Sequence, residues 1–381
     1  MKLKLGIIGV GNIASAHIGN VLEGRCPEIE ITALADRKES RREWARERIP
    51  TAAIFAEGTE LIHSGTCEAV LIAVPHYQHP TLAIEAFRAG LHVMCEKPAG
   101  VYTLQVREMN TEADRHPELT FGMMFNQRTN CVYRKMKEML DAGELGEIKR
   151  VNWIVTDWYR TQSYYDSGAW RATWSGEGGG VLLNQCPHQL DLLQWLCGLP
   201  VRVHAFCHEG KWHDIEVEDD VTAWSLQTAR RVCLSRPPAT RREQTALRLP
   251  VRRAESFAKT ISSPMTSWRR TSASGASSAG RASGSRRAGA LKLKQTGVLN
   301  AFAAHIASGV PLVADGREGI RGLMLSNAIH LSGWTGETVE LPIDEQRFLE
   351  LLRLRCASSR RKEDHDVVMD TSESYGSRTK G

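Results

Sequence analysis

A lysine follows a short apolar stretch near the end of the first quarter of the chain. Residues 91–95 read Leu-His-Val-Met-Cys and predict a buried strand, and Glu96, Lys97 and Pro98 come directly after it. Proline has no backbone N–H and biases the preceding residue toward an extended conformation, so the strand should end here. Sheets of α/β proteins bind ligands at the carboxyl ends of their strands. We therefore expect Lys97 to transfer a proton at a ligand site, although a surface lysine in a turn would show the same local pattern.

A second group of candidate residues follows the glycine run at 178–180. The sequence continues through Asn184 to Pro187 and His188. Proline is favoured at the first position of a helix, so His188 should lie in a first helical turn, with Asp191 on the same face. A histidine beside a lysine can serve as a proton-transfer pair. A single histidine can equally cap a helix or pack in a core.

The amino terminus predicts an element that holds a dinucleotide. Residues 2–10 follow a buried strand pattern, and residues 9–14 then form a G-x-G-x-x-A motif at the start of a helix pattern. The two glycines allow a tight turn and close approach to a pyrophosphate, which would lie at the amino-terminal end of the helix. The expected cofactor-contacting residues of this motif are Gly9, Gly11, Asn12 and Ile13.

The next strand pattern bears on the choice of cofactor. Residues 30–35 end at Asp36, and a carboxylate there would accept hydrogen bonds from the adenosine ribose and repel a 2′-phosphate. This position favours NAD. Arg37 follows directly and could instead neutralise a 2′-phosphate, so NADP is the alternative cofactor.

Further cofactor contacts are expected at the next strand ends. Residues 69–75 form a buried strand pattern, and Val74 and Pro75 should face the cofactor at the end of this strand. Glu96 should face the cofactor at the end of the strand that follows. His79 would contact the nicotinamide side of the cofactor or cap the helix that follows. Strands and helices alternate up to Glu96 and beyond, which predicts an α/β fold with a parallel, doubly wound sheet.

Aromatic and charged residues are concentrated at 159–174, which contains Tyr, Trp, Arg and Asp in close succession. Aromatic faces can stack on the C–H groups of a sugar while Arg and Asp bind its hydroxyl groups. The segment therefore suits a sugar or polyol. A loop packed on the domain surface is the alternative interpretation.

The composition is that of a globular protein with two domains. The chain has 381 residues, of which 42% are hydrophobic and 24% are charged, and no stretch is long enough to span a membrane. Its nine cysteines are scattered without a C-x-x-C pair, which predicts reduced thiols in the cytoplasm. The group His204, Cys207, His208 and His213 fits no standard metal spacing, so we expect no metal site.

A basic segment interrupts a chain that is otherwise acidic. Residues 228–296 carry 13 Arg and 3 Lys against 2 Glu, whereas the net charge of the whole protein is only +5. Residues 272–290 are rich in Ser, Gly, Ala and Arg and lack strand periodicity. One interpretation is a nucleic-acid-binding insert. The other, which we favour over a nucleic-acid partner, is a shifted reading frame.

The shifted frame is a hypothesis that permitted codons allow. Codons can be chosen for residues 224–231 such that reading them one base earlier encodes the peptide LEFANGAT. This peptide contains the Asn-Gly signal of a β-hairpin. The frame would return near residue 296. If the hairpin sequence of the original frame is lost, the segment 224–296 should be irregular. The strands expected at 151–156, 201–207 and 221–223 should then have unpaired edges.

These motifs resemble those of the glucose–fructose oxidoreductase, inositol dehydrogenase and MocA family (Gfo/Idh/MocA). The resemblance extends over most of the chain outside 224–296 and the carboxyl-terminal tail. The matching pieces are GVGNIA at 9–14, AVPHYQHPTLAIEAFRAGLHVMCEKP at 73–98, GELGEI at 143–148, GGGVLLNQCPHQLDLLQWLCG at 178–198 and GVLNAFAAHIASGVPLVADGREGI at 297–320.

The resemblance implies a fold and a domain division. A Rossmann domain would occupy 1–124, and an α/β domain with a large, mostly antiparallel sheet would occupy 125–223 and 297–350. The basic segment 224–296 would disrupt that sheet, and 351–381 would form a polar tail. The implied activity is NAD(P)-dependent oxidation or reduction at a carbon of a sugar, inositol or related polyol, in a homo-oligomer that the basic segment would weaken.

The resemblance also assigns residues. The catalytic lysine of the family corresponds to Lys97 and its catalytic histidine to His188, while Asn184 stands where the family often has aspartate. An amide cannot ionise, so a non-catalytic NAD-binding sensor, or a product inactivated by the frameshift, is the alternative to an enzyme. The expected substrate-binding residues are Asn126, Trp170, Arg171 and Asp191.

Overall fold

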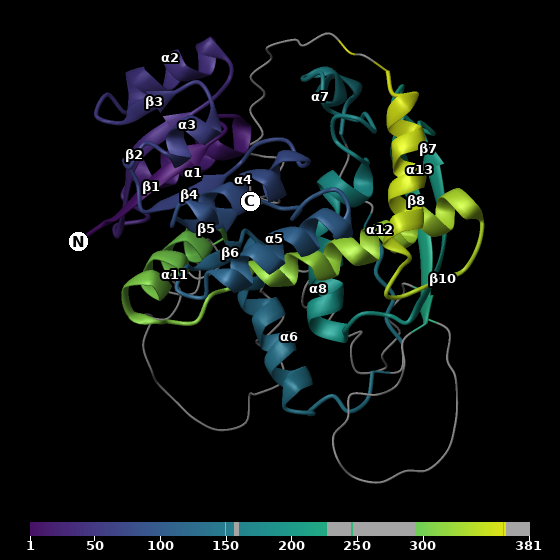
Figure 1. Ribbon diagram of the computed structural model, residues 1–381. Helices are drawn as coiled ribbons and strands as arrows, with labels where there is room; N and C mark the ends of the chain where they lie inside the picture. Colours follow the sequence, from purple (N-terminus) through teal and green to yellow (C-terminus); the bar gives the residue numbers. More distant parts are fainter. Residues whose placement is uncertain (149, 156–159, 227–244, 247–293, 361, 363–381) are drawn as a thin grey trace, which may run out of the picture.

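The computed structural model describes residues 1–148, 150–155, 160–226, 245–246, 294–360 and 362. Its amino-terminal part contains the predicted parallel sheet, with strand order β3-β2-β1-β4-β5-β6 (Figure 1). The strands are β1 (Leu3–Ile8), β2 (Ile29–Ala35), β3 (Ala53–Phe55), β4 (Ala69–Ile72), β5 (His92–Cys95) and β6 (Phe121–Met123). The strand order reverses between β1 and β4, and ligands of such sheets bind at this reversal.

Helices cover both faces of this sheet. They are α1 (Asn12–Leu22), α2 (Glu39–Arg48), α3 (Gly58–Ile62), α4 (Gln78–Arg88) and α5 (Thr103–Arg115). Neighbouring residues of a strand point to opposite faces. Ile8 accordingly packs in the core on the side of α4 and α5, while Ile7 packs with α1 on the other side. Burial on both faces explains why these strands are almost entirely apolar.

A helix from the carboxyl-terminal third of the chain packs against the first sheet. Helix α11 (Lys294–Ser308) places Val298, Leu299 and Phe302 in the same core as Ile7. In Figure 1 this green helix lies beneath β5 and β6, far from the yellow helix α13 (Glu345–Ala357). Sequence reasoning placed all of 297–350 in the second domain, whereas α11 packs on the nucleotide-binding sheet because its apolar face fills that side of the core.

The second domain combines helices with a small antiparallel sheet. The sheet has the order β10-β7-β8-β9, with β7 (Arg202–Glu209), β8 (Glu218–Leu226), β9 (Thr245–Ala246) and β10 (Val339–Glu340). Helix α12 (Gly319–Thr335) packs on one face, where the Ser332 hydroxyl accepts a hydrogen bond from the Ala205 N–H at 2.9 Å. The antiparallel arrangement is confirmed, but among the described residues the sheet has four strands and is not large.

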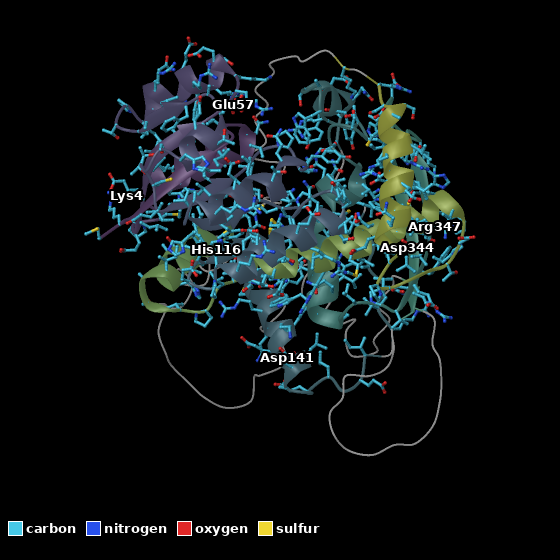
Figure 2. The ribbon with its side chains drawn as sticks, viewed as in Figure 1. Lys4, Glu57, His116, Asp141, Asp344 and Arg347 are labelled. Atoms are coloured by element: carbon cyan, nitrogen blue, oxygen red, sulfur yellow. The ribbon has the colours of Figure 1, made fainter. Side chains whose placement is uncertain are left out.

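The remaining helical elements connect the two domains and surround the second. They are η1 (Asn126–Thr129), α6 (Cys131–Asp141), α7 (Gln162–Asp166), the π-helix η2 (Val181–Gln185), α8 (Pro187–Cys197), η4 (Gly316–Glu318) and α13 (Glu345–Ala357). Charged side chains such as Glu57, Asp141 and Arg347 lie at the outside of the molecule (Figure 2). No helix in the described ranges has the length and apolar character needed to cross a membrane.

Three expectations about the second domain need correction. Strand β7 pairs with both β10 and β8, so the edges predicted to be unpaired at 201–207 are occupied. The described residues at 150–155 form no extended strand, although their sequence alternates. Residues 351–357 belong to α13 and contribute Leu352 to the core, so the polar tail begins later than residue 351.

The basic segment lies mostly outside the described residues. Its two ends are regular, because β8 continues to Leu226 and α11 begins at Lys294. The prediction of an irregular, frameshifted region therefore concerns 227–293, of which only β9 is described.

Candidate active site

Lys97 connects the two domains. It follows β5 directly, and its Nζ donates a hydrogen bond to the backbone carbonyl of Asn184 at 3.1 Å, across 87 residues of sequence. Its surroundings are buried. Burial lowers the pKa of the Lys97 amine, and the nearby carboxylates of Glu96 and Glu177 oppose that shift without cancelling it. A lysine held in this way can exchange a proton under milder conditions than a lysine at the surface.

Glu96 is tied to the nucleotide-binding helix. Its Oε1 lies 2.7 Å from Nε2 of His17 on α1, and both side chains are buried. Its Oε2 accepts a hydrogen bond from the Lys97 N–H at 3.1 Å. Burial raises the pKa of the Glu96 carboxyl. The contact with His17 and the nearby charges lower this pKa by more than burial raises it, so the net shift is downward. Glu96 thus links α1 to the backbone of Lys97.

The glycine motif fits a dinucleotide phosphate. Gly9 has a φ of +90°, and a Cβ there would lie 2.6 Å from the carbonyl oxygen of Ala73. A Cβ on Gly11 would meet nothing within 4 Å, so space is open above the start of α1. Gly11 is the N-cap of α1 and has no side chain that could cap the helix. The N–H groups of Asn12 and Ile13 in the first turn are therefore available to an anion, which binds favourably at a helix amino terminus.

Asp36 and Arg37 have different environments. The Asp36 carboxylate accepts hydrogen bonds from the N–H groups of Val10 at 2.7 Å and Lys38 at 2.9 Å, which fix it at the end of β2. Each of its oxygens retains a second acceptor site for a ribose hydroxyl. Arg37 instead pairs with Glu57 at 2.9 Å on the exposed surface. This ion pair draws the guanidinium away from the role of a 2′-phosphate ligand.

His79 has a structural position in the first turn of α4. Its Nδ1 lies 2.7 Å from the carbonyl oxygen of Pro98 and its Nε2 lies 2.8 Å from that of Val74. The ring is buried, and burial lowers its pKa. His79 therefore ties the end of β4, where Val74 and Pro75 lie, to the turn after Lys97, a role that neither sequence interpretation included.

Asn184 lies at the centre of a polar network. Its Nδ2 donates to Oε1 of Glu177, and its Oδ1 accepts from the Tyr164 hydroxyl at 3.3 Å. Tyr164 in turn accepts from Nη1 of Arg171 at 2.9 Å. His188, 5% exposed, follows in the first turn of α8 as predicted, one helical turn beyond Asn184.

Trp170 and Arg171 lie beside this network. The Arg171 guanidinium stacks over the rings of Tyr164 and Trp170, each at 4.6 Å from the ring centre. Trp170 also contacts the edge of His76, with ring centres 5.5 Å apart. The structure thus brings together Tyr164, Trp170 and Arg171 of the predicted sugar-binding segment.

A buried contact between Glu218 and His330 supports the turn that carries Asn184. The Glu218 carboxylate accepts hydrogen bonds from the N–H groups of Gly180 and Leu182, at 2.9–3.0 Å and 2.9 Å, and lies 3.1 Å from Nε2 of His330 on α12. Burial raises the pKa of Glu218, but His330 and the backbone donors outweigh it and lower the net value. This pair holds the start of η2 against β8 and α12.

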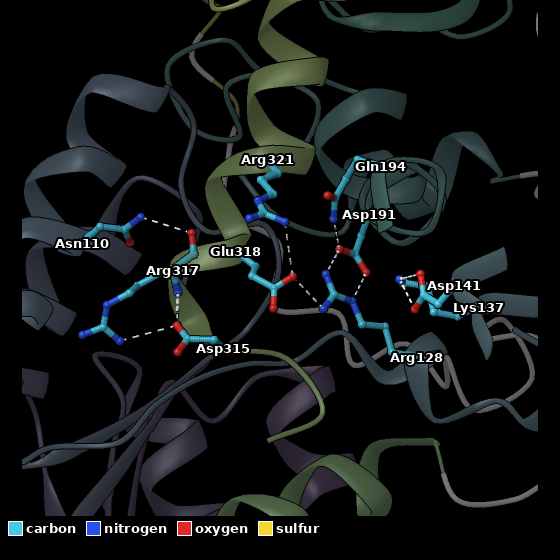
Figure 3. A network of polar contacts seen from close by, with 10 residues as sticks. All are labelled: Asn110, Arg128, Lys137, Asp141, Asp191, Gln194, Asp315, Arg317, Glu318 and Arg321. Atoms are coloured by element: carbon cyan, nitrogen blue, oxygen red, sulfur yellow. Dashed lines mark hydrogen bonds and ion pairs between the residues drawn. The ribbon is translucent and has the colours of Figure 1, made fainter. Parts of the chain in front are cut away.

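Two predicted substrate residues have other surroundings. Asp191 is 1% exposed and accepts two hydrogen bonds from Arg128, at 2.6 and 2.9 Å, so the structure does not bring it to Lys97 (Figure 3). Asn126, 6% exposed, begins η1 after β6. Its Oδ1 is buried without a hydrogen-bond partner among the described residues, which leaves an acceptor for a ligand.

Sequence reasoning missed Glu177, His17 and Glu218. Glu177 is a single acidic residue just before the glycine run, and His17 follows the glycine motif by one turn, but neither pattern indicates a partner. Glu218 carries no local signal. Of the four residues tested as metal ligands, His213 contacts Asp219 and the carbonyl of Arg160, and the described part of the chain contains no group of three side chains arranged to hold a metal.

The fold and this site define a nucleotide-binding α/β oxidoreductase of the Rossmann class. The chain belongs to the Gfo/Idh/MocA family. Residues 3–122 match the family's profile for an oxidoreductase with an NAD-binding Rossmann fold, and residues 133–230 match the profile of the GFO/IDH/MocA C-terminal domain. The cofactor domain predicted from the sequence is therefore confirmed as an NAD-binding domain.

Two curated relatives illustrate the similarity. The chain is 26% identical over 200 residues to inositol 2-dehydrogenase of Corynebacterium glutamicum, a match that covers 52% of this chain and 55% of that protein. It is 27% identical over 198 residues to the rhizopine catabolism protein MocA of Rhizobium meliloti, covering 52% and 58%. The chain therefore matches somewhat more than half the length of these relatives.

Solved structures match over a longer range. The WlbA dehydrogenase from Chromobacterium violaceum, solved with NADH and UDP-GlcNAcA, superimposes with a TM-score of 0.71 and 25% identity, covering 90% of this chain and 97% of that one. The scyllo-inositol dehydrogenase from Lactobacillus casei, solved with NAD(H) and scyllo-inositol, gives a TM-score of 0.59 at 17% identity, covering 89% and 99%, and supports the fold alone.

Proposed function

We propose that this protein is an NAD-dependent dehydrogenase that transfers hydride between the nicotinamide and a carbon of a sugar, inositol or related polyol. The observation that carries the proposal is the position of Lys97, whose Nζ reaches Asn184 from the end of β5. The lysine is thus held between the nucleotide-binding sheet and the start of α8. Hydride transfer is the chemistry that the nicotinamide supplies when bound.

The protein's own residues would handle the substrate proton. Oxidation of a hydroxyl group requires a base, and Lys97 can accept the proton because burial lowers its pKa. His188 in the first turn of α8 is the second proton-transfer candidate. In the reverse direction, the same groups would return a proton to a carbonyl oxygen.

A sugar or cyclitol would be held by the residues on the α7 side of the site. Trp170 offers an aromatic face and Arg171 offers donors for hydroxyl oxygens. The named relatives support this substrate class, since they include an inositol 2-dehydrogenase and a dehydrogenase solved with the sugar nucleotide UDP-GlcNAcA. Asn126 would contribute its buried Oδ1 as a further polar contact.

A substrate panel would test the enzyme against the sensor. The full chain is incubated with NAD and with inositols, hexoses, hexuronic acids and sugar nucleotides in turn, and NADH formation is followed by absorbance. We expect turnover of at least one member, abolished by Lys97→Ala. If the chain binds NAD in calorimetry but turns over nothing, and Lys97→Ala leaves its biological output intact, it is a sensor.

We also propose a preference for NAD over NADP. The support is the fixed Asp36 carboxylate and the pairing of Arg37 with Glu57. Calorimetric titration with each cofactor would test this, and tighter binding of NADP would overturn the role given to Asp36.

The setting of the protein is a further part of the proposal. We place it in the cytoplasm, where the buried thiols of Cys26, Cys67 and Cys95 would stay reduced. A homo-oligomer would form through the open face of the antiparallel sheet, where Phe206 and Trp224 are 48% and 41% exposed and in contact with each other. Light scattering at several concentrations would measure its size.

A further inference from the structure

We propose that Glu177 is a positioning residue of the reaction centre, whose carboxylate provides the negative charge that stabilises the protonated form of Lys97 and fixes the side chain of Asn184. The inference rests on the proposed dehydrogenase function. The amide of Asn184 cannot carry a charge. The proposal therefore assigns the negative charge of the site to Glu177, seven positions earlier in the sequence.

The geometry places one residue between the two groups. Glu177 is 1% exposed, and its Oε1 accepts a hydrogen bond from Nδ2 of Asn184. The backbone carbonyl of that same asparagine accepts from Nζ of Lys97 at 3.1 Å. A carboxylate in this position therefore acts on Lys97 both through space and through the orientation of Asn184.

The amide is held in one orientation. Its oxygen accepts from the hydroxyl of Tyr164, which itself accepts from Arg171, so Nδ2 is directed to Glu177. The second carboxylate oxygen of Glu177 accepts from the N–H of Ala172 at 2.6 Å. Ala172 has a φ of 54°, a left-handed conformation that non-glycine residues seldom adopt, and this hydrogen bond helps to hold it.

Glu177 is one of two carboxylates that oppose the lowering of the Lys97 pKa. Burial lowers the pKa of the lysine, and Arg160 and Arg171 lower it further. Of the two carboxylates that raise it, Glu96 is already paired with His17. The titratable and charged groups facing Lys97 are Glu96, Glu177, Arg160, Arg171, His76, His79 and Cys186. Loss of the Glu177 charge would therefore remove one of the two carboxylates that favour the ammonium.

The net pKa of the Glu177 carboxyl is raised above its ordinary value. Burial raises its pKa, and Glu218 adds to that, while Arg171, Ala172 and Asn184 favour the carboxylate. The positive charge that forms on Lys97 during oxidation would favour the ionised form further.

The chemical step has a complete balance. The substrate carbinol loses a hydride from carbon to the nicotinamide and a proton from oxygen to Nζ of Lys97, and a carbonyl group forms. The amine becomes an ammonium, and Glu177 compensates this new charge. In the reverse direction the ammonium returns its proton to the carbonyl oxygen, and the same carboxylate stabilises the reactant state.

Two substitutions move the charge while preserving the hydrogen bond. Glu177→Gln removes the charge but keeps an acceptor for Ala172, and the amide of Asn184 can rotate to accept from the new NH₂ group. The double variant Glu177→Gln/Asn184→Asp reverses the donor and acceptor and places the charge at position 184. Glu216→Gln is the matched control, because Glu216 accepts from Trp174 in the same loop at 2.6 Å but does not face Lys97.

The first readout needs no substrate. The full chain is labelled with an amine-acylating reagent at a series of pH values and digested with trypsin. Residues 89–107 form one peptide with Lys97 as its sole lysine, because trypsin does not cleave before proline. We expect Glu177→Gln to shift the labelling midpoint of Lys97 about 1 to 3 pH units lower. The double variant should return it toward the original value, and Glu216→Gln should leave it unchanged.

The second readout is the pH profile of kcat/KM with the substrate found in the panel. The acid limb should shift lower in Glu177→Gln and return in the double variant, while NAD affinity stays within twofold. Unchanged labelling midpoints in both variants would overturn the proposal even if the protein is an active dehydrogenase. Shifted midpoints without any turnover would support the charge role of Glu177 and contradict the proposed function. If Glu177→Gln fails to fold, the double variant alone decides, since a midpoint equal to that of the original chain supports the charge role and a changed one contradicts it.

Discussion

The cofactor side and the substrate side of the site are built by different kinds of contact. On the cofactor side, the glycine motif, Asp36 and Lys97 each follow directly on a strand, and their positions depend on local sequence. On the substrate side, Asn184 and the glycine run before it are held by partners from distant elements, among them Glu218. The cofactor site should therefore tolerate damage to the second domain, whereas substrate chemistry should not.

Restoring the reading frame of 224–296 should have the largest effect and separate the two sides. We expect the repaired chain to show more soluble protein and higher turnover, because the hairpin sequence of the restored frame would add strands to the β7–β8 sheet. NAD affinity should change little. Soluble yield, calorimetry and limited proteolysis of both chains provide the measurement. A chain as written that is compact, fully active and protected at 224–296 would show that the segment is a real domain element.

Lys97→Ala should abolish the chemistry that joins the two sides. Removal of a general acid–base group costs about 100- to 10,000-fold in rate, so we expect a loss of that size in kcat/KM. NAD affinity should remain within a few-fold, since the glycine motif and Asp36 are untouched. The exposed Lys135, on α6, provides the control substitution Lys135→Ala. A Lys97→Ala variant with near-normal turnover would remove the central observation of the proposed function.

Asp191→Ala should affect stability and leave substrate binding intact. Arg128 would keep a buried charge without its main partner, which costs about 3 to 5 kcal/mol in the free energy of unfolding. Figure 3 also shows the surface pair of Lys137 and Asp141, and loss of that exposed pair should cost only about 0 to 1 kcal/mol. Denaturant unfolding of Asp191→Ala and Asp141→Ala measures the difference. A raised KM at unchanged stability would restore Asp191 to the substrate site.

Asp36→Ala should weaken the cofactor side alone. Loss of hydrogen bonds to a charged group costs about 1.5 to 3 kcal/mol, which is roughly a 10- to 100-fold rise in the Kd for NAD. Glu57→Ala should leave NAD binding nearly unchanged but improve NADP binding, because it releases Arg37. Calorimetry with both cofactors distinguishes these effects. Equal NAD affinity in Asp36→Ala and the original chain would contradict the predicted ribose contact.

The pH dependence gives the smallest and most specific effect. Oxidation requires the neutral amine of Lys97, so kcat/KM should rise with pH and level off above a pKa that burial keeps below the ordinary value for lysine. Reduction requires the ammonium and should slow over the same range. Rates measured in both directions across the stable range of the enzyme provide the test, and oxidation that is independent of pH would argue against Lys97 as the base.

The amino-acid sequence by itself determined the cofactor side. Strand patterns, the turn at Gly9 and the acidic end of β2 are local signals, since each depends on residues within a few positions of one another. The same kind of signal placed Lys97 at a strand end and His188 in a first helical turn. Other sequence expectations were wrong, among them the strand at 151–156, of which the described residues 151–155 form no extended strand, because alternation alone does not guarantee a pairing partner.

Only the tertiary structure decided which groups meet. Asp191 lies on the helix face predicted from spacing, but packing directs it to Arg128, 63 residues away. Helix α11 returns to the first sheet, and His17 meets Glu96 across 79 residues. Glu177 acquires its role solely from the way its loop folds against Asn184. Such contacts arise from burial of distant segments together, and no local pattern in the chain specifies them.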